Sequence, residues 1–296
     1  MGRIPALPRR AGSASGIRVR LAGTVIDSPR ADRAATVTIA VLAVAFALFF
    51  VLPLAGLIVR AIEEESTWSL LKEPQVRQAL GLSLWTSTVT VALTVVFGTP
   101  VAYILARGRF PGRAFLDALI DLPIVLPPTV AGVALLTAFG RRGIIGEPIE
   151  AWTGYAFSFT TTAVVMAQLL VAAPFYVRAA KSGFESMDPQ VERVAYTLGA
   201  SRVRTFFRIT VPQAWPALLA GFVLCWARSM GELGATLIFA GNLEGKTQTM
   251  PLAIISAFEG SSLGLAGAIA LSLILLVVAF LVLVVFRMAG RWARWT

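Results

Sequence analysis

Long apolar stretches alternate with short polar segments along this chain. A search for runs free of Asp, Glu, Lys and Arg finds six segments of a length suited to a helix crossing a hydrocarbon core about 30 Å thick. These predicted spans are Ala34–Val59, Gln78–Ala106, Leu122–Gly140, Ala151–Val177, Ile209–Ala227 with an extension past Arg228 and Glu232 to Leu243, and Gly260–Phe286. The segments are far longer than barrel strands and do not alternate as such strands do. The pattern therefore predicts an all-α membrane protein with six transmembrane helices.

Composition supports a membrane protein and limits its chemistry. The chain is 57% hydrophobic and 14% charged, with a mean hydropathy of +0.77, whereas a soluble domain carries about 25% charged residues. It contains no histidine and one cysteine, Cys225. An intramolecular disulfide and histidine-dependent metal or acid–base chemistry are therefore excluded. A membrane enzyme would need a cluster of acids, histidines or cysteines at one depth. We therefore expect no catalytic residue, no metal site and no enzymatic activity.

The two ends of the chain are polar. Residues 1–33 contain seven arginines among Gly, Ser and Pro, a composition that cannot bury enough apolar area to fold alone. We expect a disordered, basic cytoplasmic arm here, followed by a permease domain over 34–288 and a cytoplasmic tail over 289–296. A cleaved signal peptide is disfavoured because its apolar region would be about 7–15 residues long, shorter than Ala34–Val59.

The positive charges are distributed unevenly between the two sides of the predicted spans. With the N-terminus inside, the inner segments hold 19 Lys and Arg residues and the outer segments hold six. This asymmetry follows the positive-inside rule and predicts a multi-pass protein of the cell (inner) membrane with both termini in the cytoplasm. Anionic lipid at the inner surface accounts for the net charge of +10. Nucleic acid is therefore not an expected partner.

The inner connection at 184–212 is long and has helix signals of its own. Asp188 followed by Pro189 predicts a helix start, and Gly199 predicts its end. A single apolar stripe is formed by Val191, Val194, Ala195 and Leu198. Ser201 predicts the cap of a second short helix that stops near Pro212. On periodicity alone, this segment fits equally well an interfacial helix lying in the lipid headgroups.

The same loop resembles a known motif. The segment VERVAYTLGASRVRTFFRITVPQAWPAL is similar to the EAA loop of ABC importer permeases. The matching positions are Glu192, Ala195, Gly199, Ile209 and Pro212. The resemblance implies a type I ABC importer permease-like fold with a cytoplasmic coupling helix.

Three further blocks extend the resemblance over most of the chain, from about Gln78 to Met288. They are FGTPVAYILARGRFPG, LPIVLPPTVAGVALL and ARSMGELGATLIFAGNLEGKTQTMPLAI, and they are most similar to the molybdate-transport permeases. That family implies a homodimer, two ATP-hydrolysing subunits and an extracytoplasmic substrate-binding protein. The chain has no G-x-x-x-x-G-K-[ST] loop, so we expect no cofactor in it and ATP bound by the partner subunit.

The expected substrate is molybdate or tungstate. A sulfate or thiosulfate permease is the near alternative, because the two groups are related. An ion-driven secondary transporter is a more distant alternative, since such proteins usually contain repeated broken segments, and only one proline-broken span is evident here.

The resemblance assigns the ATPase-coupling role to a set of loop residues. These are Glu192, Ala195, Gly199, Arg202 and Pro212. The apolar stripe would contact the ATPase, and Glu192 with Arg193, Arg202 and Arg204 would orient the contact by charge. For Gly199, a plain helix cap without a partner role remains the alternative.

A second set of residues is a candidate for the pathway or gate. Pro127 and Pro128 predict a broken helix, either beside the pathway or as a packing bend. Arg228 and Glu232 form an i, i+4 pair within a span, and such charges are costly in lipid unless they are paired or face water. The pair either lines the pathway or fastens the fifth span. Thr236 adds a hydroxyl toward the outer mouth.

Overall fold

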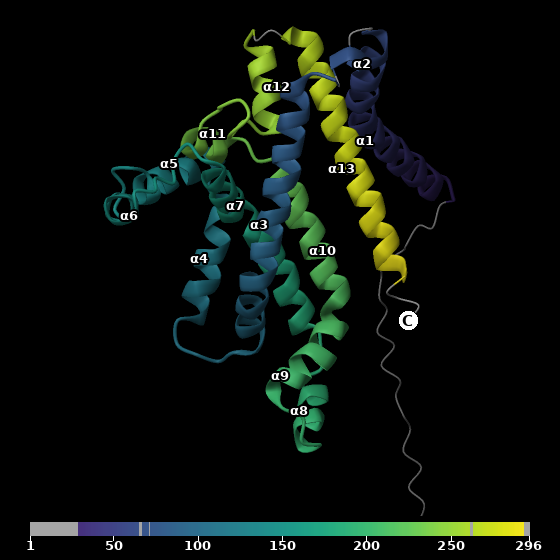
Figure 1. Ribbon diagram of the computed structural model, residues 1–296. Coiled ribbons are helices and arrows are strands. Elements are labelled where there is room, and N and C mark those ends of the chain that lie inside the picture. The colour runs from purple at the N-terminus through teal and green to yellow at the C-terminus, as the bar shows by residue number, and fades with distance from the viewer. Residues whose placement is uncertain (1–28, 65–66, 71, 261–262, 293–296) are drawn as a thin grey trace, which may run out of the picture. The chain divides into compact units, whose positions relative to one another are not determined.

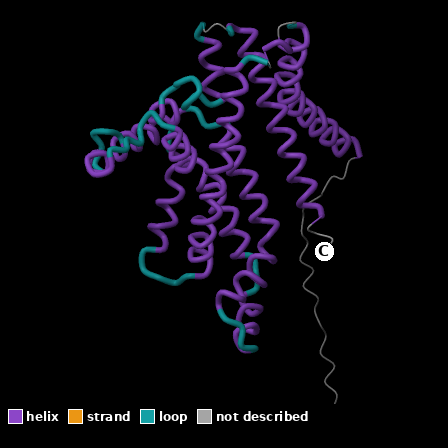
Figure 2. The backbone as a smooth tube through the Cα atoms, in the orientation of Figure 1, coloured by secondary structure: helices purple, strands orange, loops and turns teal. Residues whose placement is uncertain are grey.

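The computed structural model describes residues 29–64, 67–70, 72–260 and 263–292. Within these ranges the chain forms helices and loops without any strand (Figures 1 and 2). The helices are α1 (Pro29–Glu63), α2 (Thr67–Leu70), α3 (Pro74–Arg107), α4 (Arg113–Val125), α5 (Pro128–Phe139), α6 (Gly146–Thr153), α7 (Thr161–Glu185), α8 (Pro189–Thr197), α9 (Arg202–Thr205), the π-helix η1 (Phe206–Thr210), α10 (Val211–Met230), α11 (Gly234–Ala240), α12 (Met250–Phe258) and α13 (Gly264–Trp292).

The predicted all-α membrane class is confirmed. In the described ranges, five helical segments are long and apolar enough to cross a membrane, and α4 and α5 qualify together as a sixth, bent span. One of the five segments joins α9, η1 and α10 into one helix from Arg202 to Met230.

The chain divides into two compact units, Met1–Pro53 and Leu54–Thr296. The first unit contains the beginning of α1, where every side chain described between Thr36 and Pro53 is exposed. The predicted arm at 1–33 lies outside the described residues up to residue 28, and residues 29–33 belong to α1. Likewise, residues 289–292 of the predicted tail are the end of α13, and the rest of the tail lies outside the described residues.

The core of the second unit is built on α3, α7 and α10, which run alongside one another (Figure 1). Small residues allow α7 and α10 to approach closely. A Cβ on Gly183 would overlap the Cβ of Ala217, and one on Gly221 would lie 3.0 Å from the Cβ of Ala179. Transmembrane helices associate largely through such close packing, because lipid provides no hydrophobic drive between them. A second apolar cluster joins α5, α7 and α11, and a third joins α3, α12 and α13.

All six predicted spans have different boundaries in the structure, and the third begins nine residues earlier than predicted, at Arg113 of α4. The span predicted at Ala151–Val177 is α7, Thr161–Glu185, whose N-cap Thr160 accepts a hydrogen bond from the backbone N–H of Ala163. The extension of the fifth span to Leu243 is wrong as a continuous helix, because α10 ends at Met230 and α11 is separate. A run without charged residues indicates an apolar segment, but it does not indicate where a helix begins or ends.

The predicted break in the third span is confirmed. α4 and α5 meet at an angle of 117°. Leu126 precedes Pro127 and has an extended backbone, with ψ 137°, as expected before proline. Pro128 then starts α5, where a missing N–H costs nothing because the first turn leaves it unpaired in any case.

The orientation in the membrane stays a prediction that cysteine labelling tests. Cys225 is buried, so we expect little background reaction with an impermeant maleimide. In intact cells, Glu259→Cys should be labelled from outside, whereas Thr197→Cys should react only after the membrane is opened. Both native side chains are exposed. Labelling of Thr197→Cys in intact cells, matched by protection of Glu259→Cys, would reverse the topology.

Candidate functional site

The inner loop folds into the helix that its capping signals predict. The Asp188 carboxylate accepts a hydrogen bond of 2.8 Å from the backbone N–H of Gln190, and Pro189 occupies the first helical position of α8. Gly199 follows the helix with a φ of +84°, in the left-handed region that glycine adopts without strain. The N–H of Ala200 donates to the carbonyl of Ala195 and closes the turn.

The predicted apolar stripe of α8 divides between two faces. Ala195 packs inward, whereas Val191, Val194 and Leu198 are exposed, Leu198 to 83% and Val194 to 56%. We call these three exposed side chains the α8 stripe. Exposed apolar side chains gathered on one side of a helix mark an interaction site, either for another protein or for the lipid surface.

The helix after Gly199 does not stop near Pro212 as predicted. The Ser201 hydroxyl accepts a hydrogen bond from the N–H of Arg204 and caps α9, but the helix continues through η1 into α10. Pro212 is the second residue of α10. The π-helix has more residues per turn than an α-helix and ends two residues before Pro212, and such π segments are frequent at functional sites.

Glu192 does not share the exposed face of α8. Its residue is 7% exposed, and its carboxylate contacts residues of this chain. Thr210 donates a hydrogen bond of 2.8 Å to Oε1, and Arg107 Nε lies 3.9 Å from Oε2. The contacts that the structure shows for Glu192 are internal, and its predicted role in orienting the ATPase stays a prediction. The exposed cations Arg193, Arg202 and Arg204 remain available at the surface.

The predicted pair Arg228–Glu232 is present. An Arg228 guanidinium nitrogen lies 2.6 Å from Glu232 Oε2, and the two side chains are 28% and 1% exposed. Glu232 Oε1 also accepts a hydrogen bond of 2.9 Å from the N–H of Ala235 at the start of α11. Because α10 ends at Met230 and does not continue as predicted, Arg228 lies in its last turn, where a cation interacts favourably with the helix dipole.

The structure brings the charged pair close to the bend of the broken span. A Cβ on Gly234 would meet the Pro128 Cβ at 2.9 Å, and one on Gly132 would meet the Ile238 Cβ at 2.8 Å. The start of α11, two residues after Glu232, therefore touches the start of α5. Pro127 is exposed at the bend. Thr236 is fully buried in α11, and its hydroxyl has no hydrogen-bond partner within the described part of the chain.

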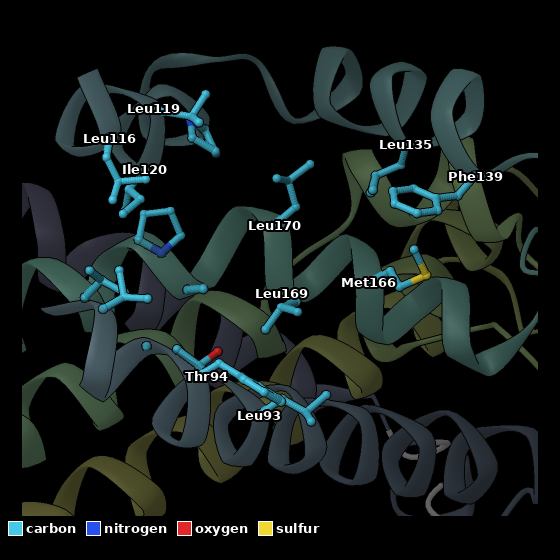
Figure 3. A pocket seen from close by; sticks show the side chains of 17 residues that line it. Leu93, Thr94, Leu116, Leu119, Ile120, Leu135, Phe139, Met166, Leu169 and Leu170 are labelled. Atoms are coloured by element: carbon cyan, nitrogen blue, oxygen red, sulfur yellow. The ribbon is translucent and has the colours of Figure 1, made fainter. Parts of the chain in front are cut away.

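A cavity of about 580 Å³ lies between α3, α4, α5 and α7 (Figure 3). Its walls are apolar, with Leu119, Leu170 and Phe139 among them, and Thr94 is the one polar side chain among its lining residues. The Thr94 hydroxyl already donates to the carbonyl of Thr90. Such a wall offers no donors to an anion, so this cavity is not an anion-binding site.

Sequence reasoning missed a ladder of ion pairs between α4 and α7. Arg113 pairs with Glu185 at 3.2 Å, Asp117 with Lys181 at 2.6 Å, and Asp121 with Arg178 at 2.6 Å. No residue of α4 is buried, so these pairs and the few apolar contacts beside the cavity hold α4 in place. The regular spacing of the three α4 charges was the available signal, but their partners lie more than 50 residues away.

The sequence is similar to permease subunits of known transport systems. The family described as "Binding-protein-dependent transport system inner membrane component" matches residues 98–294. The molybdenum transport system permease protein ModB of Escherichia coli K12 is 41% identical over 217 residues, covering 73% of this chain and 94% of that protein. The sulfate transport system permease protein CysT of the same organism is 35% identical over 249 residues, covering 83% and 89%.

Among solved structures, the fold is similar to a chain of a bacterial ABC transporter involved in the import of the acidic polysaccharide alginate. The TM-score is 0.70 at 15% identity, over 88% of this chain and 96% of the other. At this low identity, the likeness concerns the fold alone.

Proposed function

Because this chain belongs to the family of binding-protein-dependent transport system inner membrane components, we propose that it is the membrane-spanning subunit of an ATP-driven importer that passes molybdate, or the related oxyanion tungstate, to the cytoplasm. The chain is a multi-pass permease component of the inner membrane and is not the ATP-hydrolysing subunit. The observation that carries the substrate proposal is the 41% identity to a molybdenum permease over nearly the whole of that protein.

Sulfate is the second candidate substrate. The 35% identity to a sulfate permease spans a longer part of this chain, 249 residues against 217. The higher identity favours molybdate, and the two proposals differ in the transported ion and not in the kind of machine.

The proposed assembly contains two copies of this chain, two ATP-hydrolysing subunits and an extracytoplasmic binding protein. The α8 stripe supports an ATPase partner, because three exposed apolar side chains flanked by Arg193, Arg202 and Arg204 offer both apolar contact and charge. We propose that this surface is cytoplasmic and seats the ATPase. ATP is then held by that partner.

Movement of the ion requires elements that can change position. The broken span is suited to this role, because no residue of α4 is buried and the backbone between α4 and α5 is extended at Leu126 and Pro127. Its contact with α11 lies next to Arg228 and Glu232. We propose that ATP-driven displacement at α8 opens and closes the pathway near this contact.

Reconstitution tests the proposal. The permease, its cognate ATPase and its binding protein are assembled in proteoliposomes, and the binding protein is loaded to equal occupancy with molybdate or with sulfate. We expect molybdate-loaded protein to stimulate ATP hydrolysis and oxyanion uptake about tenfold more than sulfate-loaded protein, a difference of about 1.4 kcal/mol in activation free energy. Equal stimulation by both would reject the substrate proposal, and no stimulation by either would reject the importer proposal.

A further inference from the structure

Glu192 is a buried charge in a helix whose neighbouring apolar side chains are exposed. Its carboxylate faces away from the α8 stripe and toward the membrane-spanning helices. A buried carboxylate is expensive unless its oxygens are hydrogen-bonded or paired. The residues that hydrogen-bond or pair with the Glu192 carboxylate therefore indicate which helices α8 contacts.

The shortest hydrogen bond to the Glu192 carboxylate comes from Thr210, at the end of η1 where α10 begins. The Thr210 hydroxyl donates to Glu192 Oε1 at 2.8 Å and is fully buried. Thr210 is the last residue of η1, and η1 continues directly into α10, whose last turn carries Arg228. One hydrogen bond therefore connects the coupling loop to the helix that ends at the charged pair.

The contacts with α3 are longer. The Tyr103 hydroxyl donates to Glu192 Oε2 at 3.4 Å, and Arg107 Nε lies 3.9 Å from the same oxygen. Arg107 directs its hydrogen bond of 3.1 Å to the backbone carbonyl of Met187 instead. The Tyr103 ring packs edge-on against Phe206 of η1. α3 thus encloses the carboxylate, while the short hydrogen bond ties it to η1.

The hydrogen bond between Thr210 and Glu192 lies at the end of the π-helix η1. A π segment departs from the regular hydrogen bonding of an α-helix, and such segments occur frequently at functional sites. Glu192 holds the end of that segment. The hydrogen bond of Glu192 therefore meets the long helix where its backbone is least regular.

We propose that Glu192 is a positioning residue that transmits the movement of α8 to α10 through Thr210, whereas the α8 stripe makes the contact with the ATPase. This inference rests on the proposed function of α8 as the coupling helix. The inference assigns two different roles to neighbouring residues. The α8 stripe binds the ATPase, and Glu192 transmits the movement of the ATPase to the pathway.

Four variants of the full chain, each assembled with its ATPase and binding protein, test the inference. Glu192→Ala and Thr210→Val remove either partner of the hydrogen bond. Glu192→Gln keeps an acceptor oxygen, and Thr210→Ser keeps the donor hydroxyl as the matched control. The measurements are folded yield, co-purification of the ATPase, uptake half-saturation for loaded binding protein, and oxyanions transported per ATP hydrolysed.

We expect Glu192→Ala and Thr210→Val to retain the ATPase and the half-saturation value while transporting about tenfold fewer oxyanions per ATP, the factor that corresponds to losing one hydrogen bond to a charged group. Thr210→Ser should match the native protein, and Glu192→Gln should keep more than half of the native ratio. The double variant Glu192→Ala with Thr210→Val should be no worse than the more affected single variant, because both remove the same bond.

Several results would overturn the inference. They are a native transport ratio in Glu192→Ala or Thr210→Val, an equal loss in Thr210→Ser, or losses that follow folded yield with an unchanged ratio. Loss of the ATPase in Glu192→Ala would make Glu192 a docking residue and leave the proposed function standing. Retention of the ATPase by Leu198→Asp, a change in the α8 stripe, would instead reject the proposed role of α8.

Discussion

Replacing Arg228 with glutamine should lower the folded yield of this protein sharply. The change leaves the Glu232 carboxylate, 1% exposed, without its cation at 2.6 Å. Breaking a buried ion pair by removing one partner costs on the order of 3 kcal/mol. The Glu232 carboxylate keeps one stabilising hydrogen bond, because the N–H of Ala235 still donates to Oε1. The measurement is monodisperse yield and thermal unfolding of the purified protein in detergent.

The double variant Arg228→Gln with Glu232→Gln separates a structural role from a role in transport. The glutamine at 232 keeps an acceptor for Ala235 and removes the unpaired charge, so stability should recover in part. If Arg228 acts on the anion, the double variant folds and transports poorly. A double variant that is stable and fully active would show that the pair serves the fold alone. Equal yields for the native protein and Arg228→Gln would contradict the structural role.

Placing an acid in the α8 stripe should abolish capture of the ATPase. Leu198 and Val194 are 83% and 56% exposed, so Leu198→Asp or Val194→Asp leaves the fold intact while removing apolar contact area. A central interface side chain is worth about 2 kcal/mol or more, which corresponds to at least about a 30-fold weaker complex. Co-purification and ATPase titration measure the loss. Thr197→Asp is the matched control, because Thr197 is exposed on the same helix outside the stripe.

Gly199→Val should impair the same surface through the backbone. A β-branched residue at a φ of +84° costs about 1–3 kcal/mol of backbone strain. Relief of that strain changes the backbone conformation at residue 199 and thus the direction in which the chain leaves α8. The protein should still insert in the membrane, because the change lies outside the bilayer in the proposed orientation. Normal transport and normal ATPase capture in both Gly199→Val and Leu198→Asp would show that this loop is not the docking surface.

The sequence by itself determined the helical membrane class, the broken third span and the caps of α8. Each depends on local information. Apolar run length predicts spans, Pro127 and Pro128 prevent a continuous helix, and Asp188 and Gly199 satisfy backbone requirements within a few residues. The i, i+4 spacing of Arg228 and Glu232 suggested their pairing, but Glu232 lies beyond the end of α10 at Met230, so the pair forms across the helix end and not along one helix.

Tertiary structure alone decided which way Glu192 faces and which helices the charges of α4 meet. Thr210, 18 residues away, and Arg107, on another helix, draw the carboxylate inward, whereas periodicity reports only that α8 has an apolar side. The ladder from α4 to α7 and the contact of Gly234 with Pro128 likewise join residues far apart in sequence. Side chains that compensate a buried charge come from wherever the fold places them, so their identity is fixed by packing and not by local spacing.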